Sequence, residues 1–138
     1  MRAETQHFTS RIELLPDANA FVTACLDRFH APAATQFSVL LALEEAFVNI
    51  CHHAYAHGEG DIEIICAIDN GAFVLEIADR GKPFDVLSLP DPDTSLGIEE
   101  RPVGGLGLYL IRTLTSNVSY KRENDQNRLR MVFGQLAD

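Results

Sequence analysis

Residues 41–55 read LALEEAFVNICHHAY. On a helix of about 3.6 residues per turn, apolar side chains here and just upstream recur at the spacing of a buried stripe: Val39, Leu43, Phe47 and Ile50. Glu45 and Asn49 lie one turn apart on another side, and Glu44 points about 100° away from Glu45. This pattern predicts a core helix that carries a carboxylate and a carboxamide on a second face.

Strands and helices are expected on both sides of this helix. Alternation over residues 8–14 predicts a first strand ended by Pro16, and Asp17 is a candidate N-cap for a helix that stops before Ala31-Pro32. The central helix is expected to begin between residues 34 and 37. Downstream we expect strands at 61–68 and 72–78 joined by a turn at 69–71, an irregular segment at 85–103, a helix at 108–116, and strands at 118–122 and 129–136 joined by a turn at 123–127.

This order of elements predicts an α+β fold. Antiparallel hairpins combined with helices on one face make a two-layer α/β sandwich, with a mixed, mostly antiparallel sheet. The length of 138 residues fits a single domain over residues 1–138, and the irregular segment at 85–103 is a candidate lid.

Composition narrows the class of function. A net charge of -9 argues against direct nucleic-acid binding and against attraction to anionic lipid. The N-terminus has no apolar run of signal-peptide length, and no window reaches the apolar length of a membrane span, so we expect a cytoplasmic protein. Cys25, Cys51 and Cys66 lie in apolar segments without metal-site spacing, which predicts buried free thiols.

Two further features could carry chemistry. The glycine run GGLG at 104–107 precedes a helix, where backbone N–H groups can approach a phosphate, although a tight turn explains it equally well. Asp79 ends a strand two residues before Gly81, so it is either a turn former or a buried carboxylate that accepts a hydrogen bond from an exocyclic amine such as that of adenine. The glycine run matches neither the Walker nor the dinucleotide spacing.

Three motifs occur in a recognisable order: ExxxNxxxHAY at 45–55, DxG at 79–81 and GGLGL at 104–108. They resemble the N box and the two glycine boxes of the GHKL (Bergerat-fold) ATPases. Within that superfamily, EAFVNICHHAY, DRGKPFD and GGLGLYLIRTL look closest to the anti-sigma-factor serine kinases. The resemblance covers nearly the whole chain and implies a histidine-kinase-like ATPase fold.

The resemblance implies roles for individual residues. Asn49 matches the asparagine that holds Mg²⁺ on the phosphates, and Glu45 matches the general base. Asp79 matches the adenine reader, and Gly81 the glycine that lets the base approach. In the lid, Arg101 is either a cation that meets the γ-phosphate or a solvated charge. The remaining implied nucleotide contacts are His53, Gly104, Gly105, Gly107 and Leu108.

One position departs from the family pattern. Pro83 replaces the second glycine of the usual DxGxG box, which stiffens the loop and removes an N–H donor from the implied adenine pocket.

The resemblance implies an ATP-dependent protein-serine kinase that binds Mg-ATP, sequesters a sigma factor and phosphorylates a serine on a small antagonist protein. It also implies a homodimer. One alternative is a non-catalytic ATP-binding module that switches a partner through its lid. Another is a detached sensor-kinase ATPase domain acting on another protein's histidine. His52 and His53 are disfavoured as phosphoacceptors, because 138 residues leave no room for the separate dimerisation helix that carries such a residue.

Overall fold

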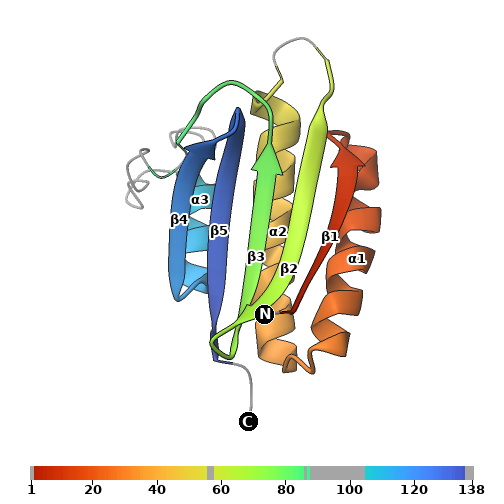
Figure 1. Cartoon of the computed structure of the whole chain (residues 1–138), viewed down its shortest axis with the longest axis vertical. Helices are drawn as coiled ribbons and strands as arrows, with labels where there is room; N and C mark the ends of the chain where they lie inside the picture. The colour runs from red at the N-terminus through yellow and green to blue at the C-terminus, as the bar shows by residue number, and fades with distance from the viewer. Residues whose placement is uncertain (1, 56–57, 86, 88–104, 136–138) are drawn as a thin grey trace.

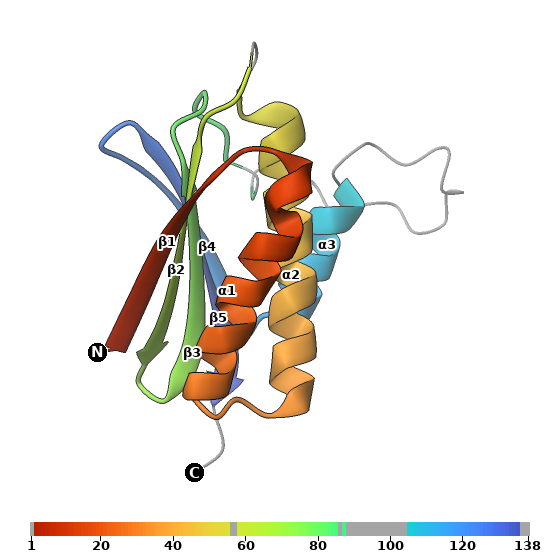
Figure 2. The same cartoon turned by 90° about the vertical axis from the view of Figure 1, so that its right-hand side faces the viewer.

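The protein is a two-layer α+β sandwich in which three helices cover one face of a five-stranded sheet (Figures 1 and 2). The computed structural model describes residues 2–55, 58–85, 87 and 105–135. The strands are β1 (Arg2–Thr9), β2 (Asp61–Asp69), β3 (Ala72–Asp79), β4 (Asn117–Glu123) and β5 (Gln126–Gln135). The helices are α1 (Leu15–Arg28), α2 (Ala33–His53) and α3 (Gly105–Leu114), with a short 3-10 helix, η1 (Ile12–Leu14), before α1.

The sheet has the strand order β1-β2-β3-β5-β4, so β3 is its central strand. Each of the four described strand pairs is antiparallel. The predicted two-layer α+β fold is therefore confirmed, while the mixed character expected of the sheet is absent from the described pairs.

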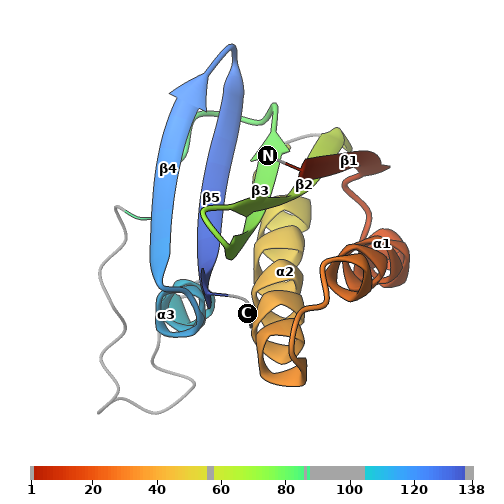
Figure 3. The same ribbon diagram turned by 60° about the horizontal axis from the view of Figure 1, so that its bottom comes forward.

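Helix α2 lies between α1 and α3 against the sheet (Figure 3). The predicted stripe is confirmed, because Val39, Leu43 and Phe47 are fully buried and Ile50 packs against the same core. Phe8 of β1 meets Phe47 edge to face, with ring centroids 6.5 Å apart. By length and composition α2 could cross a membrane, so the expectation that no window reaches the apolar length of a membrane span is wrong. Several of its apolar side chains pack in the core.

The hairpin between β2 and β3 forms as predicted. Asn70 and Gly71 both have positive φ, at 52° and 79°, as a two-residue turn between twisted strands requires. The strand that follows is buried along almost its whole length and ends at Asp79, which is 7% exposed.

The predicted first strand is misplaced. Strand β1 pairs with β2 from Arg2 to Thr9, and residues 12–14 form the short helix η1 instead. Because β1 is an edge strand with polar side chains on both faces, its apolar alternation is too weak to locate it. Pro16 does not end a strand but lies in the first turn of α1, whose N-cap is Leu14 and not Asp17.

The closing hairpin is also tighter than predicted. Asn124 and Asp125 form a two-residue turn with φ of 54° and 61°, so the loop expected at 123–127 is wrong. Gln126 and Asn127 belong to β5 and are buried, which their polar character concealed. Helix α3 begins at Gly105, three residues before the predicted start. Most of the expected lid at 85–103 lies outside the described residues.

Candidate functional site

The predicted motifs meet at one end of the sandwich. The C-terminal end of α2, the end of β3 and the beginning of α3 all lie at this end (Figures 1 and 2). The loop that follows β3 crosses it towards β4 (Figure 1). Segments that are far apart in the sequence therefore come together at one edge of the two layers.

Helix α2 contributes Glu45 and Asn49, one turn apart and both half-buried, whereas Glu44 is exposed. Burial raises the pKa of the Glu45 carboxyl, and the nearby charge of Glu44 raises it further. A carboxylate whose pKa is raised in this way is a better proton acceptor than an exposed one. The two adjacent glutamates therefore differ in environment as the helical spacing predicted.

Strand β3 delivers Asp79 into the layer that faces the helices, in line with the buried Ile77. Its Oδ1 accepts two hydrogen bonds, from the Gly81 backbone N–H at 2.8 Å and from Asn127 Nδ2 at 3.0 Å. No residue in the described part of the chain donates to Oδ2. One oxygen of this buried carboxylate is thus fixed by the protein, and the other keeps its accepting capacity.

Gly81 makes the close approach that its position in the motif suggested. A Cβ at this residue would lie 2.3 Å from the backbone oxygen of Ala54, at the end of α2. The next residue, Lys82, donates its backbone N–H to the same oxygen at 3.3 Å. The loop after β3 is therefore packed directly on the end of the helix that carries Glu45 and Asn49.

Asn127 is a site residue that the sequence reasoning missed. Besides holding Asp79, its Nδ2 donates to the Lys82 carbonyl at 2.9 Å, and its Oδ1 accepts from the Phe84 N–H at 3.2 Å and from the Tyr120 hydroxyl at 2.6 Å. Had the two-residue turn at 124–125 been recognised in the sequence, it would have placed Asn127 in the strand, on the same face as Leu129.

Tyr55 links the same elements, although the motif gave it no role. Its hydroxyl donates to the Asp61 carbonyl at 2.6 Å and accepts from the Arg80 N–H at 2.7 Å. A Cβ at Gly60 would lie 2.2 Å from its ring, so a larger residue there would displace the ring. Tyr55 thereby joins the end of α2 to the start of β2 and to the residue after Asp79.

The other predicted positions are placed less completely. His53 is exposed in the last turn of α2. Gly105, Gly107 and Leu108 lie in the first turns of α3. Arg101 and Gly104 lie outside the described residues.

The donor set of α2 suits one kind of metal. Within the described residues no three His, Cys, Asp or Glu side chains cluster as metal ligands. Mg²⁺ takes one or two protein oxygens and completes its shell with water and substrate phosphates. The half-buried carboxamide oxygen of Asn49 fits that requirement, whereas a site made only of protein ligands would need more oxygens.

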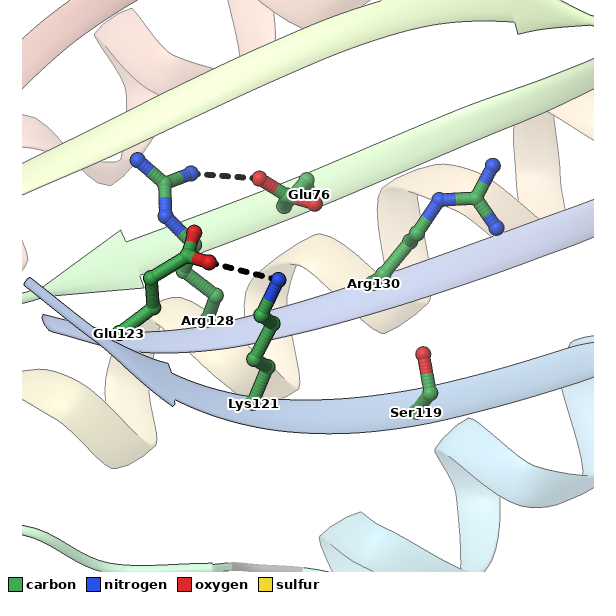
Figure 4. Close-up of a pocket in the computed structure, with 6 residues that line it drawn as sticks. All are labelled: Glu76, Ser119, Lys121, Glu123, Arg128 and Arg130. Carbon is green, nitrogen blue, oxygen red and sulfur yellow. Dashed lines mark hydrogen bonds and ion pairs between the residues drawn. The ribbon is translucent and has the colours of Figure 1, made fainter.

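A separate hollow of about 190 Å³ lies on the sheet face opposite the helices (Figure 4). It is lined by Glu76, Ser119, Lys121, Glu123, Arg128 and Arg130. Each cation has a carboxylate partner, since Arg128 pairs with Glu76, Lys121 with Glu123, and Arg130 with Asp69. The hollow lies on the other side of the sheet from Asp79 and is not part of the candidate site.

Comparison with known proteins identifies the family. The histidine kinase-like ATPase domain family matches residues 8–133, which is most of the chain and includes the N-box helix and all three motifs. The chain belongs to the histidine kinase-like ATPase domain family. The resemblance that the motifs suggested is thereby confirmed.

Related sequences point to one branch of histidine kinase-like ATPase domains. The chain is 37% identical to proteins named serine-protein kinase RsbW from Bacillus cereus, Bacillus anthracis and Bacillus thuringiensis. Each alignment covers 82 residues, 56% of this chain and 51% of the relative, so the matched region spans about half the length of those proteins.

A solved structure of the RsbU and RsbW domains of a Mycobacterium tuberculosis protein shares the fold. Its TM-score is 0.68 at 16% identity, over 98% of this chain and 33% of that one.

Proposed function

We propose that this protein is an ATP-dependent protein-serine kinase of the anti-sigma-factor type. The observation that carries the proposal is the arrangement of α2. Its half-buried Glu45 and Asn49 lie on a helix whose end packs on the loop after the buried Asp79. These residues would supply a proton acceptor, an oxygen ligand for Mg²⁺ and a carboxylate that recognises the adenine base. The similarity to proteins named serine-protein kinase supports the choice of serine as acceptor.

Glu45 would accept the proton of the attacking serine hydroxyl as that oxygen bonds to the γ-phosphorus of ATP. The raised pKa of Glu45 suits it to this role, because a general base works best when its pKa approaches the working pH. Asn49 would hold Mg²⁺, which supplies charge neutralisation at the phosphates when bound. The leaving ADP would carry away the electron pair of the broken bond.

Asp79 would recognise adenine through the exocyclic amino group, with Gly81 leaving room for the base. The start of α3 at Gly105 and Gly107 would face the phosphates, since backbone N–H groups at a helix N-terminus favour anions. Gly104, Leu108 and His53 are proposed nucleotide neighbours, and Arg101 is a proposed γ-phosphate contact from the lid.

The partners follow from the family resemblance. We propose a sigma factor as the sequestered partner and a small serine-bearing antagonist as the phosphoacceptor. We further propose that the protein acts in the cytoplasm as a homodimer. No direct role at nucleic acid or membrane is proposed.

Phosphotransfer to a candidate antagonist tests the proposal. The protein is incubated with γ-labelled ATP, Mg²⁺ and the antagonist, and we expect a phosphoserine that survives acid. An acid-labile product would indicate transfer to histidine. Tight ATP binding without transfer would instead support the non-catalytic switch.

Two matched variants test whether Glu45 is the general base. Glu45→Gln should bind Mg-ATP but lose transfer by about 10²- to 10⁴-fold. Glu44→Gln, one residue away and exposed, should retain it. Full transfer by Glu45→Gln would show that Glu45 is not the base.

A further inference from the structure

The carboxamide of Asn127 makes four hydrogen bonds at the candidate site, and they converge on one loop. Nδ2 donates to Asp79 Oδ1 and to the Lys82 carbonyl, while Oδ1 accepts from the Phe84 N–H and the Tyr120 hydroxyl. Asn127 is itself 8% exposed, so these bonds form largely away from water. A carboxamide that makes four hydrogen bonds fixes the orientation of the groups to which it bonds.

Two of these bonds bracket Pro83. The proline has no N–H to donate, and it stands at the second-glycine position of the DxGxG box that this motif resembles. The Lys82 carbonyl before the proline and the Phe84 N–H after it both bond to the Asn127 side chain. This side chain therefore takes the place of a neighbouring strand as hydrogen-bond partner of the loop. Arg122 adds a bond from its guanidinium to the Gly81 carbonyl at 2.9 Å. Side chains of the closing hairpin thus hold the loop on both sides of Pro83.

The third bond acts on the carboxylate itself. Asn127 Nδ2 and the Gly81 N–H both occupy Oδ1 of Asp79, so the carboxylate cannot exchange its two oxygens without breaking both bonds. Oδ2 then remains as the acceptor, in a fixed direction, because no described residue donates to it. A fixed acceptor favours a nucleotide base that has an amino group at the matching position. With a nucleotide base that lacks this group, the acceptor stays unpaired.

We propose that Asn127 is a positioning residue that fixes Asp79 Oδ2 towards the amino group of the nucleotide base and so sets the preference for adenine. This inference rests on the proposed function, because it assumes that Asp79 reads the base of ATP. It adds that the closing hairpin, and not only the first glycine box, determines base selectivity.

The test compares ATP with its analogue that lacks the 6-amino group, purine riboside triphosphate, by titration calorimetry with Mg²⁺ and the full chain. The wild type should bind ATP about 10- to 100-fold more tightly than the analogue, as expected for one hydrogen bond to a charged acceptor. Asn127→Ala should weaken ATP binding by a similar factor, change analogue binding much less, and so reduce the ratio to a few-fold.

Two further variants separate positioning from folding. Asn127→Asp keeps the size of the side chain but removes its donor, and should lose the preference at least as fully. Gln126→Ala is the matched control, because Gln126 is equally buried in the same strand and its side chain bonds only to Arg128 among the described residues. It should retain the ATP-to-analogue ratio. Thermal melts establish that each variant is folded at the temperature of the titration.

The outcomes are distinguishable. If the Asn127 variants weaken both nucleotides equally, or keep the full ratio, Asn127 does not position Asp79 and the inference is wrong while ATP binding stands. If the wild type binds neither nucleotide, the proposed function fails and the inference fails with it.

Discussion

Glu45 combines a chemical role with a cost in stability. Its raised pKa means that the ionised carboxylate is less favourable in the folded chain than in the unfolded one. The folded state is therefore penalised above the raised pKa, and the penalty disappears once the pH falls below the ordinary value of 4.5. Functional groups often carry such a penalty, because the burial that shifts their pKa also disfavours their charged form.

Replacing this residue should therefore stabilise the protein. We expect Glu45→Gln to raise the melting temperature by a few degrees at neutral pH, and to lose this advantage as the pH is lowered towards 4.5, where wild-type Glu45 is itself protonated. Melting curves of both proteins across pH 4–8 check this. A variant that is less stable than the wild type at neutral pH would contradict the inferred burial of the charge.

Gly81 is required by close approach and not by backbone conformation. Gly81→Ala would place a methyl group against the Ala54 carbonyl, and we expect a loss of about 1–3 kcal/mol in the free energy of unfolding, together with weaker ATP binding. Denaturant unfolding and nucleotide titration measure the two effects. Gly134→Ala is the control, because Gly134 has a positive φ of 35° but open space around its Cα. If Gly81→Ala binds ATP normally, the contact with α2 does not shape the site.

At the scale of elements, the end of α2 is held by side chains of neighbouring segments. Tyr55→Phe removes the hydroxyl that joins the Asp61 carbonyl to the Arg80 N–H. We expect a loss of about 1–2 kcal/mol in the free energy of unfolding and weaker nucleotide binding, since Arg80 directly follows Asp79. Both quantities can be followed by denaturant titration and calorimetry.

The control for Tyr55 is Ser10→Ala. Ser10 accepts a hydrogen bond from the Gly60 N–H at 2.9 Å, on the far side of the same junction. We expect this variant to lose comparable stability but to bind ATP as the wild type does. Equal effects of the two variants on binding would mean that Tyr55 acts only through general stability.

The two hairpin turns differ by one residue type. Both have two central residues with positive φ, but the β2–β3 turn is Asn70-Gly71 and the β4–β5 turn is Asn124-Asp125. Asp125→Gly should therefore raise the free energy of unfolding by about 0.5 kcal/mol, because glycine adopts positive φ without a steric cost. Gly71→Asp should lower it by a similar amount. Urea unfolding of the two variants tests this pair, and a loss of stability in Asp125→Gly would contradict it.

At the scale of the whole molecule, the burial of the three cysteines shows which parts of the core are closed to solvent. Cys25 and Cys66 are fully buried between α1 and β2, while Cys51 is only half-buried. Burial raises the pKa of all three thiols, which favours the protonated and less nucleophilic form. The prediction of buried free thiols is confirmed for Cys25 and Cys66, and Cys51 is free but partly exposed.

Thiol alkylation should therefore occur in two classes. We expect Cys51 to react first, and Cys25 and Cys66 to react at least about 10³-fold more slowly than in the denatured chain, because they become accessible only on unfolding. Mass spectrometry of a time course with iodoacetamide distinguishes the sites. Early modification of Cys66 in the native protein would show that the contact between α1 and the sheet opens locally.

Local pattern determined much of this protein. The helical spacing of Val39, Leu43 and Phe47, the Asn-Gly turn at residues 70–71 and the alternation along β2 each depend on residues close in sequence, so they could be predicted. The order of the three motifs was sufficient to recognise the family. The different environments of Glu44 and Glu45 also followed from helical geometry alone.

Only the tertiary structure placed β1 and Asn127. The edge strand forms because β2 offers a pairing partner some sixty residues away, and its own sequence has little apolar alternation. Asn127 is polar and follows a turn, so its sequence suggests a loop. It is buried because Asp79 and the loop around Pro83, more than forty residues upstream, supply hydrogen-bond partners that replace water. Sequence pattern reports which face of an element is apolar, whereas satisfaction of a buried polar group depends on what the fold brings next to it.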